Sequence, residues 1–267
     1  MTVSLLITTY NWKEALTLTL RSVFCQTTLP NEIIIADDGS RDDTLQIIKL
    51  LRLETSIPIL HVWHEDSGFR LTTIRNKAIA AASSEYIIQI DGDIILNKYF
   101  IQDHIGLAEA NCFVCGSRVK INAKDTKLIF DGKSYNFGFF NQSHRSMFNS
   151  LRSKVLREFL AHRYKKKSIA KLRGCNMAFW KNNLIEVNGY NEDLKEWGHE
   201  DSEIAYRLHF AGIKKKYLKM GGVAYHLDHT KASRDNENFH RQTILRLIQK
   251  KAIWCDNGLN KYLNGEK

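Results

Sequence analysis

The strongest constraint on the fold is an alternation within the first hundred residues. Short, nearly continuous apolar runs cover residues 3–8, 32–37, 59–63 and 86–91, and segments with helical spacing lie between them at 13–25, 42–53 and 71–82. Uninterrupted apolar runs are typical of strands buried on both faces. Strand–helix repeats of this length indicate right-handed βαβ units. We therefore expect an α/β fold with a Rossmann-like, mostly parallel central sheet flanked by helices.

The pattern becomes mixed after residue 100. We expect a strand at 112–121, a loop or hairpin at 127–140, a strand at 222–225, a helix from about 199 to 211 and a final helix around 238–254. No repeat, low-complexity tract or Pro/Ser-rich linker divides the chain. The sequence therefore predicts a single domain over residues 1–267.

Polar residues follow three of the predicted strands. Strand one ends in TTYN at residues 8–11, strand two in DDGS at 37–40, and strand four in DGD at 91–93. The carboxyl ends of parallel strands meet at one edge of the sheet, where ligands bind. Two acids separated by one glycine repel each other unless a cation offsets them, and Mg²⁺ or Mn²⁺ held by oxygen ligands commonly binds substrate phosphates as well. A lone DGD is as readily a turn, but three such strand ends favour a metal and phosphate site.

A second acidic cluster surrounds the start of the helix predicted near residue 199. Glu200 and Asp201 fall in its first turn, where the helix dipole favours carboxylates. Helix capping and surface charge are the alternative explanation for acids at this position. The preceding Trp197 and Gly198 favour a binding site instead, because a ring and a close backbone approach are typical of a sugar platform.

Taken together, these motifs resemble those of the family 2 glycosyltransferases of the GT-A fold. The resemblance runs from about residue 2 to 230 through TTYN, DDGS, GFRLTTIRNKAI, DGD, RGCNMAFW, GYNEDLKEWGHEDSE and AYH, in that order. The later motifs resemble the acceptor region of galactosyltransferases and of chondroitin- and hyaluronan-polymerising enzymes. The resemblance implies a nucleotide-sugar half at residues 1–100, a mixed acceptor half at 101–235 and a C-terminal helix at 236–267.

The resemblance also implies a UDP-sugar donor, bound by residues of the first half. It assigns six residues to that donor: Thr8 and Tyr10 line the uridine pocket with the Tyr10 ring on uracil, Asp38 accepts a hydrogen bond from uracil, Arg75 lies near the nucleotide, Asp91 reaches the ribose, and Asp93 is the main metal ligand. A stacking face, an acceptor for an imide N–H and a cation on a diphosphate are what such a donor requires.

On the acceptor side, the similarity to the WGxED motif implies that Asp201 is the general base. Glu200 would hold a neighbouring acceptor hydroxyl, with Trp197 and Gly198 completing the acceptor platform. A single base opposite a departing nucleoside diphosphate implies displacement with inversion. The acceptor would be a hydroxyl of a glycan or of a lipid-linked glycan in cell-surface polysaccharide synthesis.

The metal cofactor would be Mn²⁺ or Mg²⁺, and a histidine would complete its site. In the similar enzymes a histidine follows the strand that ends in AYH, which places the ligand at His226. His229 lies three residues further along the chain and is the alternative, because metal ligation depends on geometry that the sequence leaves open. For either residue a purely structural role is also open.

The net charge of +10 is concentrated in one segment. Residues 145–173 contain ten Lys or Arg and one acid, whereas the rest of the chain has 29 basic and 28 acidic residues. Met147, Leu151, Val155, Phe159 and Leu160 recur there at helical spacing. A basic amphipathic helix could lie on an anionic membrane, or it could bury its apolar side on its own domain.

Two other classes of protein compete with this interpretation. A sugar nucleotidyltransferase would need a Gly-rich loop after the first strand, and TTYNWKE contains no glycine. A nucleic-acid-binding protein would interleave aromatic residues with its basic stripe, whereas here they follow one helical face. We therefore expect no nucleic-acid partner. An odd number of cysteines and the lack of a signal peptide predict a cytoplasmic protein. If the basic segment 145–173 lies on lipid, it would hold the protein at the inner face of the cell membrane.

Overall fold

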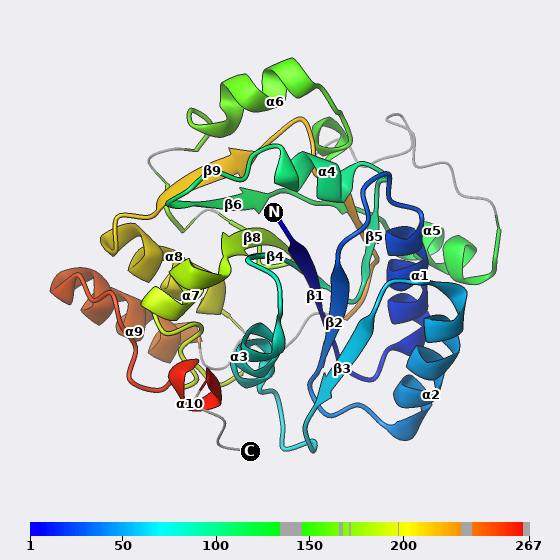
Figure 1. The fold of residues 1–267 in the computed structure, drawn as a ribbon, viewed down its shortest axis with the longest axis horizontal. Helices are drawn as coiled ribbons and strands as arrows, with labels where there is room; N and C mark the ends of the chain where they lie inside the picture. The colour runs from blue at the N-terminus through cyan, green and yellow to red at the C-terminus, as the bar shows by residue number, and fades with distance from the viewer. Residues whose placement is uncertain (134–145, 166–167, 171, 197, 231–236, 264–267) are drawn as a thin grey trace.

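A seven-stranded sheet forms the centre of the computed structural model, which describes residues 1–133, 146–165, 168–170, 172–196, 198–230 and 237–263 (Figure 1). The strand order is β3-β2-β1-β4-β8-β6-β9. The strands are β1 Val3–Thr9, β2 Glu32–Asp37, β3 Ile59–Trp63, β4 Tyr86–Asp91, β6 Cys112–Gly116, β8 Asn176–Trp180 and β9 Lys214–Leu218. Only the two pairings of β8 are antiparallel. The predicted mostly parallel sheet is confirmed.

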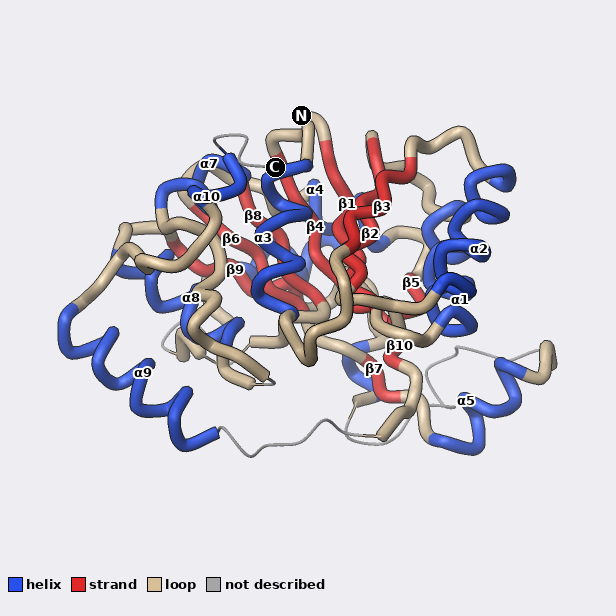
Figure 2. Tube along the Cα trace, turned by 90° about the horizontal axis from the view of Figure 1, so that it is seen from below, coloured by secondary structure: helices blue, strands red, loops and turns tan. Residues whose placement is uncertain are grey.

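Helices cover both faces of this sheet. The residues of α1 (Lys13–Phe24), α2 (Asp42–Leu51), α4 (Phe100–Ile105) and α6 (Lys154–Ala161) join one apolar core, and those of α3 (Leu71–Ala81), α7 (Lys181–Glu186) and α8 (Glu200–Phe210) join another. Both views show α1 and α2 on one side of β1–β3 and α3 on the other (Figures 1 and 2). Along β1, Leu5 and Ile7 face the first core while Leu6 faces the second. Burial on both sides explains why the strand sequences are apolar at nearly every position.

A small second sheet lies beside the carboxyl ends of the main strands. It consists of β5 (Ile94–Leu96), β10 (Ala224–His226) and β7 (Val119–Lys120), in the order β5-β10-β7. Figure 2 shows β7 and β10 below the main sheet. In the antiparallel pair, His226 lies opposite Ile94, the residue that follows Asp93. The pairing therefore brings two predicted metal ligands, 133 positions apart in the chain, to one place.

Three predicted elements differ from those observed. The strand expected at 112–121 is split into β6 and β7, and part of the loop expected at 127–140 is helix α5 (Ala123–Phe130). Asn122 caps α5 by accepting a hydrogen bond from the backbone N–H of Asp125, 2.9 Å away, a local signal for a helix start. Residues 134–140 lie outside the described part of the chain. The last helix, α9 (Glu237–Lys250), ends earlier than predicted, and a short α10 (Asn260–Leu263) follows it.

The basic segment 145–173 does not form one long helix. Within its described part, Met147 belongs to a 3₁₀ turn at Met147–Asn149, and only Lys154–Ala161 is α-helical. The apolar face of α6 points to solvent, with Val155, Leu156 and Phe159 exposed by 76%, 46% and 55%. The expectation that an ordinary surface helix would bury this face on its own domain is wrong for these three residues.

An ionic contact holds the inner side of α6. Arg157 is buried and forms an ion pair with the buried carboxylate of Asp103. Asp103 also accepts hydrogen bonds from Arg152 at 3.0 Å and from the backbone N–H of Gly222 at 3.0 Å. A buried carboxylate with several donors can anchor a helix whose apolar residues face outward. No helix in the described residues is long and apolar enough to cross a membrane.

Candidate active site

The carboxyl ends of β1, β2 and β4 meet as the sequence predicts. The Thr8 hydroxyl donates a hydrogen bond to Asp91 Oδ1 at 3.0 Å, and the backbone N–H of Asp38 donates to the Thr9 carbonyl at 3.0 Å. Tyr10 follows β1, and its hydroxyl donates to Asp66 Oδ2 at 2.9 Å while half of the residue stays exposed. The structure therefore brings Thr8, Tyr10, Asp38 and Asp91 to one edge of the sheet, where one ligand could contact all four residues.

Asp38 is held by a partner that the sequence analysis missed. His64 Nε2 lies 2.7 Å from Asp38 Oδ1, and both residues are buried. The backbone N–H of Arg70 donates to the second carboxylate oxygen at 2.9 Å. The parallel pairing of β2 with β3 brings the ends of these two strands together, which is the signal that could have linked His64 to DDGS. The Asp38 carboxylate is thereby fixed in orientation.

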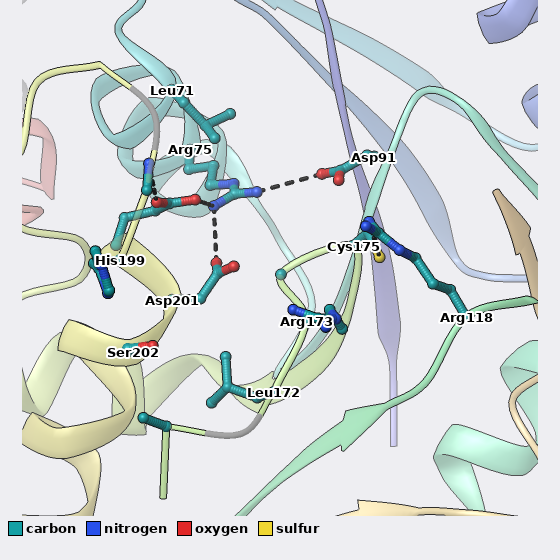
Figure 3. A pocket seen from close by; sticks show the side chains of 14 residues that line it. Leu71, Arg75, Asp91, Arg118, Leu172, Arg173, Cys175, His199, Asp201 and Ser202 are labelled. Carbon is teal, nitrogen blue, oxygen red and sulfur yellow. Dashed lines mark hydrogen bonds and ion pairs between the residues drawn. The ribbon is translucent and has the colours of Figure 1, made fainter. Parts of the chain in front are cut away.

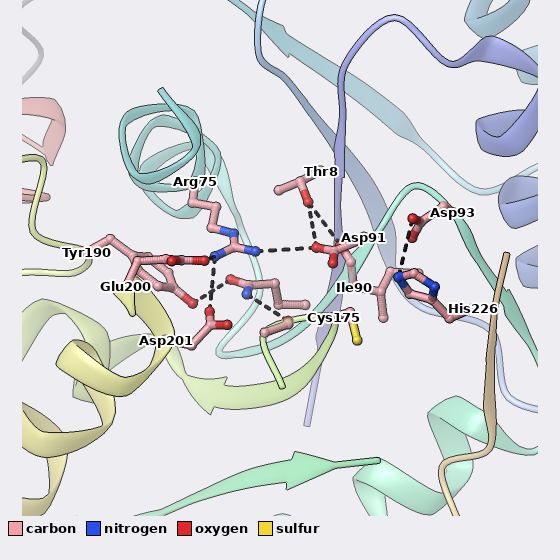
Figure 4. A network of polar contacts seen from close by, with 12 residues as sticks. Thr8, Arg75, Ile90, Asp91, Asp93, Cys175, Tyr190, Glu200, Asp201 and His226 are labelled. Atoms are coloured by element: carbon pink, nitrogen blue, oxygen red, sulfur yellow. Dashed lines mark hydrogen bonds and ion pairs between the residues drawn. The ribbon is translucent and has the colours of Figure 1, made fainter. Parts of the chain in front are cut away.

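Arg75 connects the two predicted halves of the site. Its buried guanidinium lies 3.3 Å from Asp91 Oδ1, 3.2 Å from Asp201 Oδ1 and 3.5 Å from Glu200 Oε1 (Figure 4). Burial opposes this charge, but the neighbouring groups, Tyr190 and then the carboxylates, outweigh it and raise the pKa of Arg75. Arg75 therefore stays charged and fixes the β4 end against the start of α8, a bridging position that the resemblance did not indicate.

Asp201 lies in the first turn of α8, and the loop that precedes this helix has an unusual backbone conformation. Glu196 and His199 have positive φ angles of 67° and 69°, and such strained residues cluster at functional sites. Burial, followed by the charge of Glu200, raises the pKa of Asp201 to about 7, although Arg75 opposes the shift. A carboxylate with a pKa near neutrality is suited to accept a proton.

The residue opposite the Asp201 carboxylate is a glycine, Gly174. A Cβ atom at Gly174 would overlap the carboxylate of Asp201. Gly174 comes directly before Cys175 and β8, in the RGCNMAFW motif. This close approach explains the glycine of that motif in physical terms.

A cavity of about 350 Å³ lies between the strand ends and α8 (Figure 3). Its charged lining consists of Arg75, Asp91, Arg118, Arg173, Glu200 and Asp201. The predicted base and the predicted ribose ligand therefore line one cavity. Arg118 and Arg173 were not singled out as site residues from the sequence, because no motif surrounds Arg118 and Arg173 was counted with the basic segment.

Asp93, His226 and His229 form a compact cluster. One ligand atom from each lies within 4.8 Å of the other two. Asp93 Oδ2 is 3.5 Å from His226 Nε2 (Figure 4). It is also 3.1 Å from His229 Nε2, whereas the buried Asp93 Oδ1 has no hydrogen-bond partner among the described residues. The hydrogen bond to Asp93 raises the pKa of His229, while burial lowers the pKa of His226 despite Asp93. An unsatisfied buried carboxylate oxygen beside two imidazoles fits a divalent cation, with either or both histidines as ligands.

Gly198 and Glu200 are the two residues of the predicted acceptor platform that the structure describes. Trp197 lies outside the described residues. Gly198 has a φ of 118°, and its backbone N–H donates to Glu200 Oε2 at 3.2 Å. The loop before α8 therefore depends on a glycine at this position, and Glu200 contacts both this loop and Arg75.

Comparison with known families identifies the chain. The family described as glycosyl transferase family 2 matches residues 4–183, well over half of the sequence. The chain belongs to glycosyl transferase family 2. A second family, described as the N-terminal domain of galactosyltransferase, matches residues 155–230 of this family 2 member and includes the start of α8 and His226. Both parts of the predicted resemblance are confirmed.

Individual relatives agree with this membership. Chondroitin synthase of Escherichia coli is 26% identical over 93% of this chain, which spans 38% of that protein. The structure of S. aureus TarS 1-349 in complex with UDP-GlcNAc superimposes with a TM-score of 0.63 at 18% identity, over 99% of this chain and 72% of that one. The mannosyltransferase PcManGT of Pyrobaculum calidifontis, in complex with GDP-Man and Mn²⁺, gives 0.60 at 17% identity, over 91% and 61%. These structures confirm the predicted GT-A fold, and the chain spans well under half of the curated relative.

Proposed function

We propose that this family 2 member is an inverting, metal-dependent glycosyltransferase that moves a hexose or N-acetylhexosamine from a UDP-sugar to a hydroxyl of a glycan or lipid-linked glycan. The observation that carries the proposal is the cavity of Figure 3, with Asp91 on one side and Asp201 on the other, joined through Arg75. The chondroitin synthase relative and the TarS complex with UDP-GlcNAc support a polysaccharide product and a UDP-sugar donor. Family membership favours glycosyl transfer over nucleotidyl transfer.

The donor would bind at the strand ends of the nucleotide-sugar half. The half-exposed ring of Tyr10 offers a face for uracil, and Asp38 accepts the uracil N–H while His64 and the Arg70 amide hold it in place. Asp91, oriented by Thr8 and Arg75, receives the ribose. The residues that read the nucleotide are thus fixed before it arrives, which lowers the cost of ordering them.

Transfer itself needs one proton acceptor. The acceptor hydroxyl gives its proton to the Asp201 carboxylate as its oxygen bonds to the anomeric carbon. The bond between that carbon and the β-phosphate oxygen breaks, and its electron pair leaves with UDP. Attack from the side opposite the diphosphate inverts the configuration, and Glu200 holds a neighbouring hydroxyl of the acceptor.

Asp93, His226 and His229 would hold the metal ion. Two imidazoles in the ligand set suit Mn²⁺ better than Mg²⁺, which prefers oxygen ligands throughout. The mannosyltransferase complex with Mn²⁺ supports this choice. When bound, such an ion stabilises the negative charge that develops on the leaving diphosphate.

The outward face of α6 would dock the enzyme on an anionic membrane. Val155, Leu156 and Phe159 are exposed together, and Lys154 and Arg163 flank them. Apolar side chains surrounded by basic ones bind the boundary between lipid headgroups and acyl chains. Changing Val155 and Phe159 to serine should weaken binding to vesicles that contain phosphatidylglycerol, whereas Leu53→Ser, at another exposed leucine, should not. If the variant with serine at 155 and 159 bound these vesicles as well as Leu53→Ser does, membrane docking through α6 would be contradicted. The enzymatic proposal would be unaffected.

Calorimetric titration with UDP tests the donor site. We expect UDP to bind the wild-type protein tightly with Mn²⁺ and weakly with a chelator. The Asp93→Asn variant should bind UDP equally weakly under both conditions, while Asp43→Asn, at an exposed acid of α2, should match the wild type. If added Mn²⁺ left the affinity of the wild type unchanged, metal dependence would be refuted. NMR analysis of the anomeric configuration of the product tests inversion.

A further inference from the structure

The small sheet positions one more charged residue beside the metal cluster. Arg118 immediately precedes β7, which pairs in parallel with β10 so that Val119 lies opposite Tyr225. Asp93 precedes β5, on the other side of β10. The three strands of one sheet therefore bring Asp93, His226 and Arg118 to neighbouring places. Arg118 also lines the cavity that contains Asp91 and Asp201 (Figure 3).

The guanidinium of Arg118 has no carboxylate partner among the described residues. Its closest polar contact is an uncharged thiol, with Arg118 Nη1 at 3.6 Å from Cys175 Sγ. Its Nε is buried and finds no hydrogen-bond partner in the part of the chain that the structure describes. By contrast, the buried arginines 75, 157 and 207 all form ion pairs with carboxylates. The charges of Asp91 and Asp93 act on Arg118 from a distance, but no carboxylate of the described residues accepts its hydrogen bonds. A partly buried guanidinium with free donors favours an anionic ligand that can accept them.

The position of Arg118 indicates which anion this is. Arg118 lines the cavity that contains Asp201, and it lies close enough to Asp93 and His226 for its charge to act on both. The charged group that the proposed reaction brings between the base and the metal ligands is the donor diphosphate. A guanidinium donates two parallel hydrogen bonds to a phosphate with matching geometry. We propose that Arg118 is a catalytic residue that donates hydrogen bonds to the diphosphate of the sugar donor. This inference rests on the proposed function.

Arg118 would act at bond cleavage. As the bond between the anomeric carbon and the phosphate oxygen breaks, its electron pair becomes additional negative charge on UDP. A fixed guanidinium stabilises this charge more than the smaller charge of the intact donor, and so it lowers the barrier.

The test compares binding of uridine and UDP by calorimetry, with Mn²⁺ present, for the wild type, Arg118→Gln, Arg118→Lys and the control Lys120→Gln. The last variant removes an exposed cation from β7, two residues from Arg118. We expect Arg118→Gln to weaken UDP binding about 10- to 100-fold, the range for a lost charged hydrogen bond, with uridine affinity unchanged. Arg118→Lys should recover part of the loss, and Lys120→Gln should bind UDP like the wild type. Mn²⁺ binding by Arg118→Gln, followed by electron paramagnetic resonance, should be unchanged.

Three results would overturn the inference. UDP affinity of Arg118→Gln equal to that of the wild type would exclude contact with the diphosphate. An equal loss for uridine and UDP would mean that Arg118 acts by maintaining the structure of the pocket. If the wild type bound neither ligand, the proposed function would fail first, and the inference with it.

Discussion

Replacing Asp201 by asparagine should stop transfer and make the protein more stable at neutral pH. Burial and Glu200 raise the pKa of this carboxyl from 3.8 to about 7. The folded protein therefore holds the proton more tightly than the unfolded chain does, and ionised Asp201 destabilises the fold. Stability is lost as the pH rises between these two values, and the full loss is about 4 kcal/mol at about 1.4 kcal/mol per pKa unit. Asparagine cannot ionise, so the variant avoids this loss.

Urea denaturation of both proteins at two pH values measures the effect. The difference in free energy of unfolding between Asp201→Asn and the wild type should grow by about 2–3 kcal/mol from about pH 5 to about pH 8. The attraction between ionised Asp201 and Arg75 is already contained in the raised pKa, and the remaining effect of the substitution on packing is the same at both pH values, so that effect cancels from the change. Asp193→Asn, at an exposed acid, is the control and should show no pH-dependent difference. A stability difference that stays constant with pH would refute a raised pKa at Asp201.

Further predictions concern the surroundings of Asp201 and the anchor of α6. The Gly174→Ala variant should retain UDP affinity in calorimetry but lose turnover, because the added methyl group would overlap the Asp201 carboxylate; wild-type turnover would contradict this. The value of kcat/KM should rise with pH through about 7, because the ionised form of Asp201 is the base. Glu200→Gln should move the midpoint of this rise to lower pH, because the charge of Glu200 raises the pKa of Asp201. An unmoved midpoint would exclude coupling between the two carboxyl groups. Asp103→Ala should lower the free energy of unfolding by about 3–5 kcal/mol in urea titrations, because it leaves the buried Arg157 with only the exposed Glu158 at 3.8 Å as a partner. A loss below about 1 kcal/mol would show that the ion pair with Asp103 is unimportant.

The parallel part of the sheet could be predicted from sequence because its residues carry one simple signal. Leu5, Leu6 and Ile7 are all buried, so β1 is apolar without interruption, and β2, β3 and β4 have the bounds that their apolar runs predict. The strand ends then follow from topology, since parallel strands deliver their last residues to one edge. This explains why Thr8, Asp38 and Asp91 could be placed together in advance.

The basic segment could not be predicted in the same way. Its apolar spacing left open whether Val155 and Phe159 are buried on the domain or face outward, and the structure gives the buried position to Arg157, held by Asp103 from α4. A contact between residues 54 positions apart decides which face of α6 turns inward, and periodicity contains no information about it.

Residues of the candidate site could be predicted from the sequence only where they belong to a motif. Asp93 and Asp201 belong to recognisable motifs, whereas His64 and Arg118 stand in ordinary surroundings and gain their positions from strand pairing. The choice between His226 and His229 depended on the path of the chain after β10, which brings both imidazoles to Asp93. The division into a nucleotide-sugar half and an acceptor half stays a prediction, although β4 and β8 from the two halves pair within one sheet.

Release of UDP from a panel of UDP-sugars tests the central proposal most directly. The panel would include UDP-glucose, UDP-galactose and their N-acetylamino counterparts, incubated with Mn²⁺ and a mixture of glycan acceptors. The account predicts UDP release from at least one donor by the wild-type protein, loss of that release with a chelator, and loss in Asp201→Asn although this variant still binds UDP. No release from any donor would contradict the proposed function, and near-normal release by Asp201→Asn would contradict the assignment of Asp201 as the base.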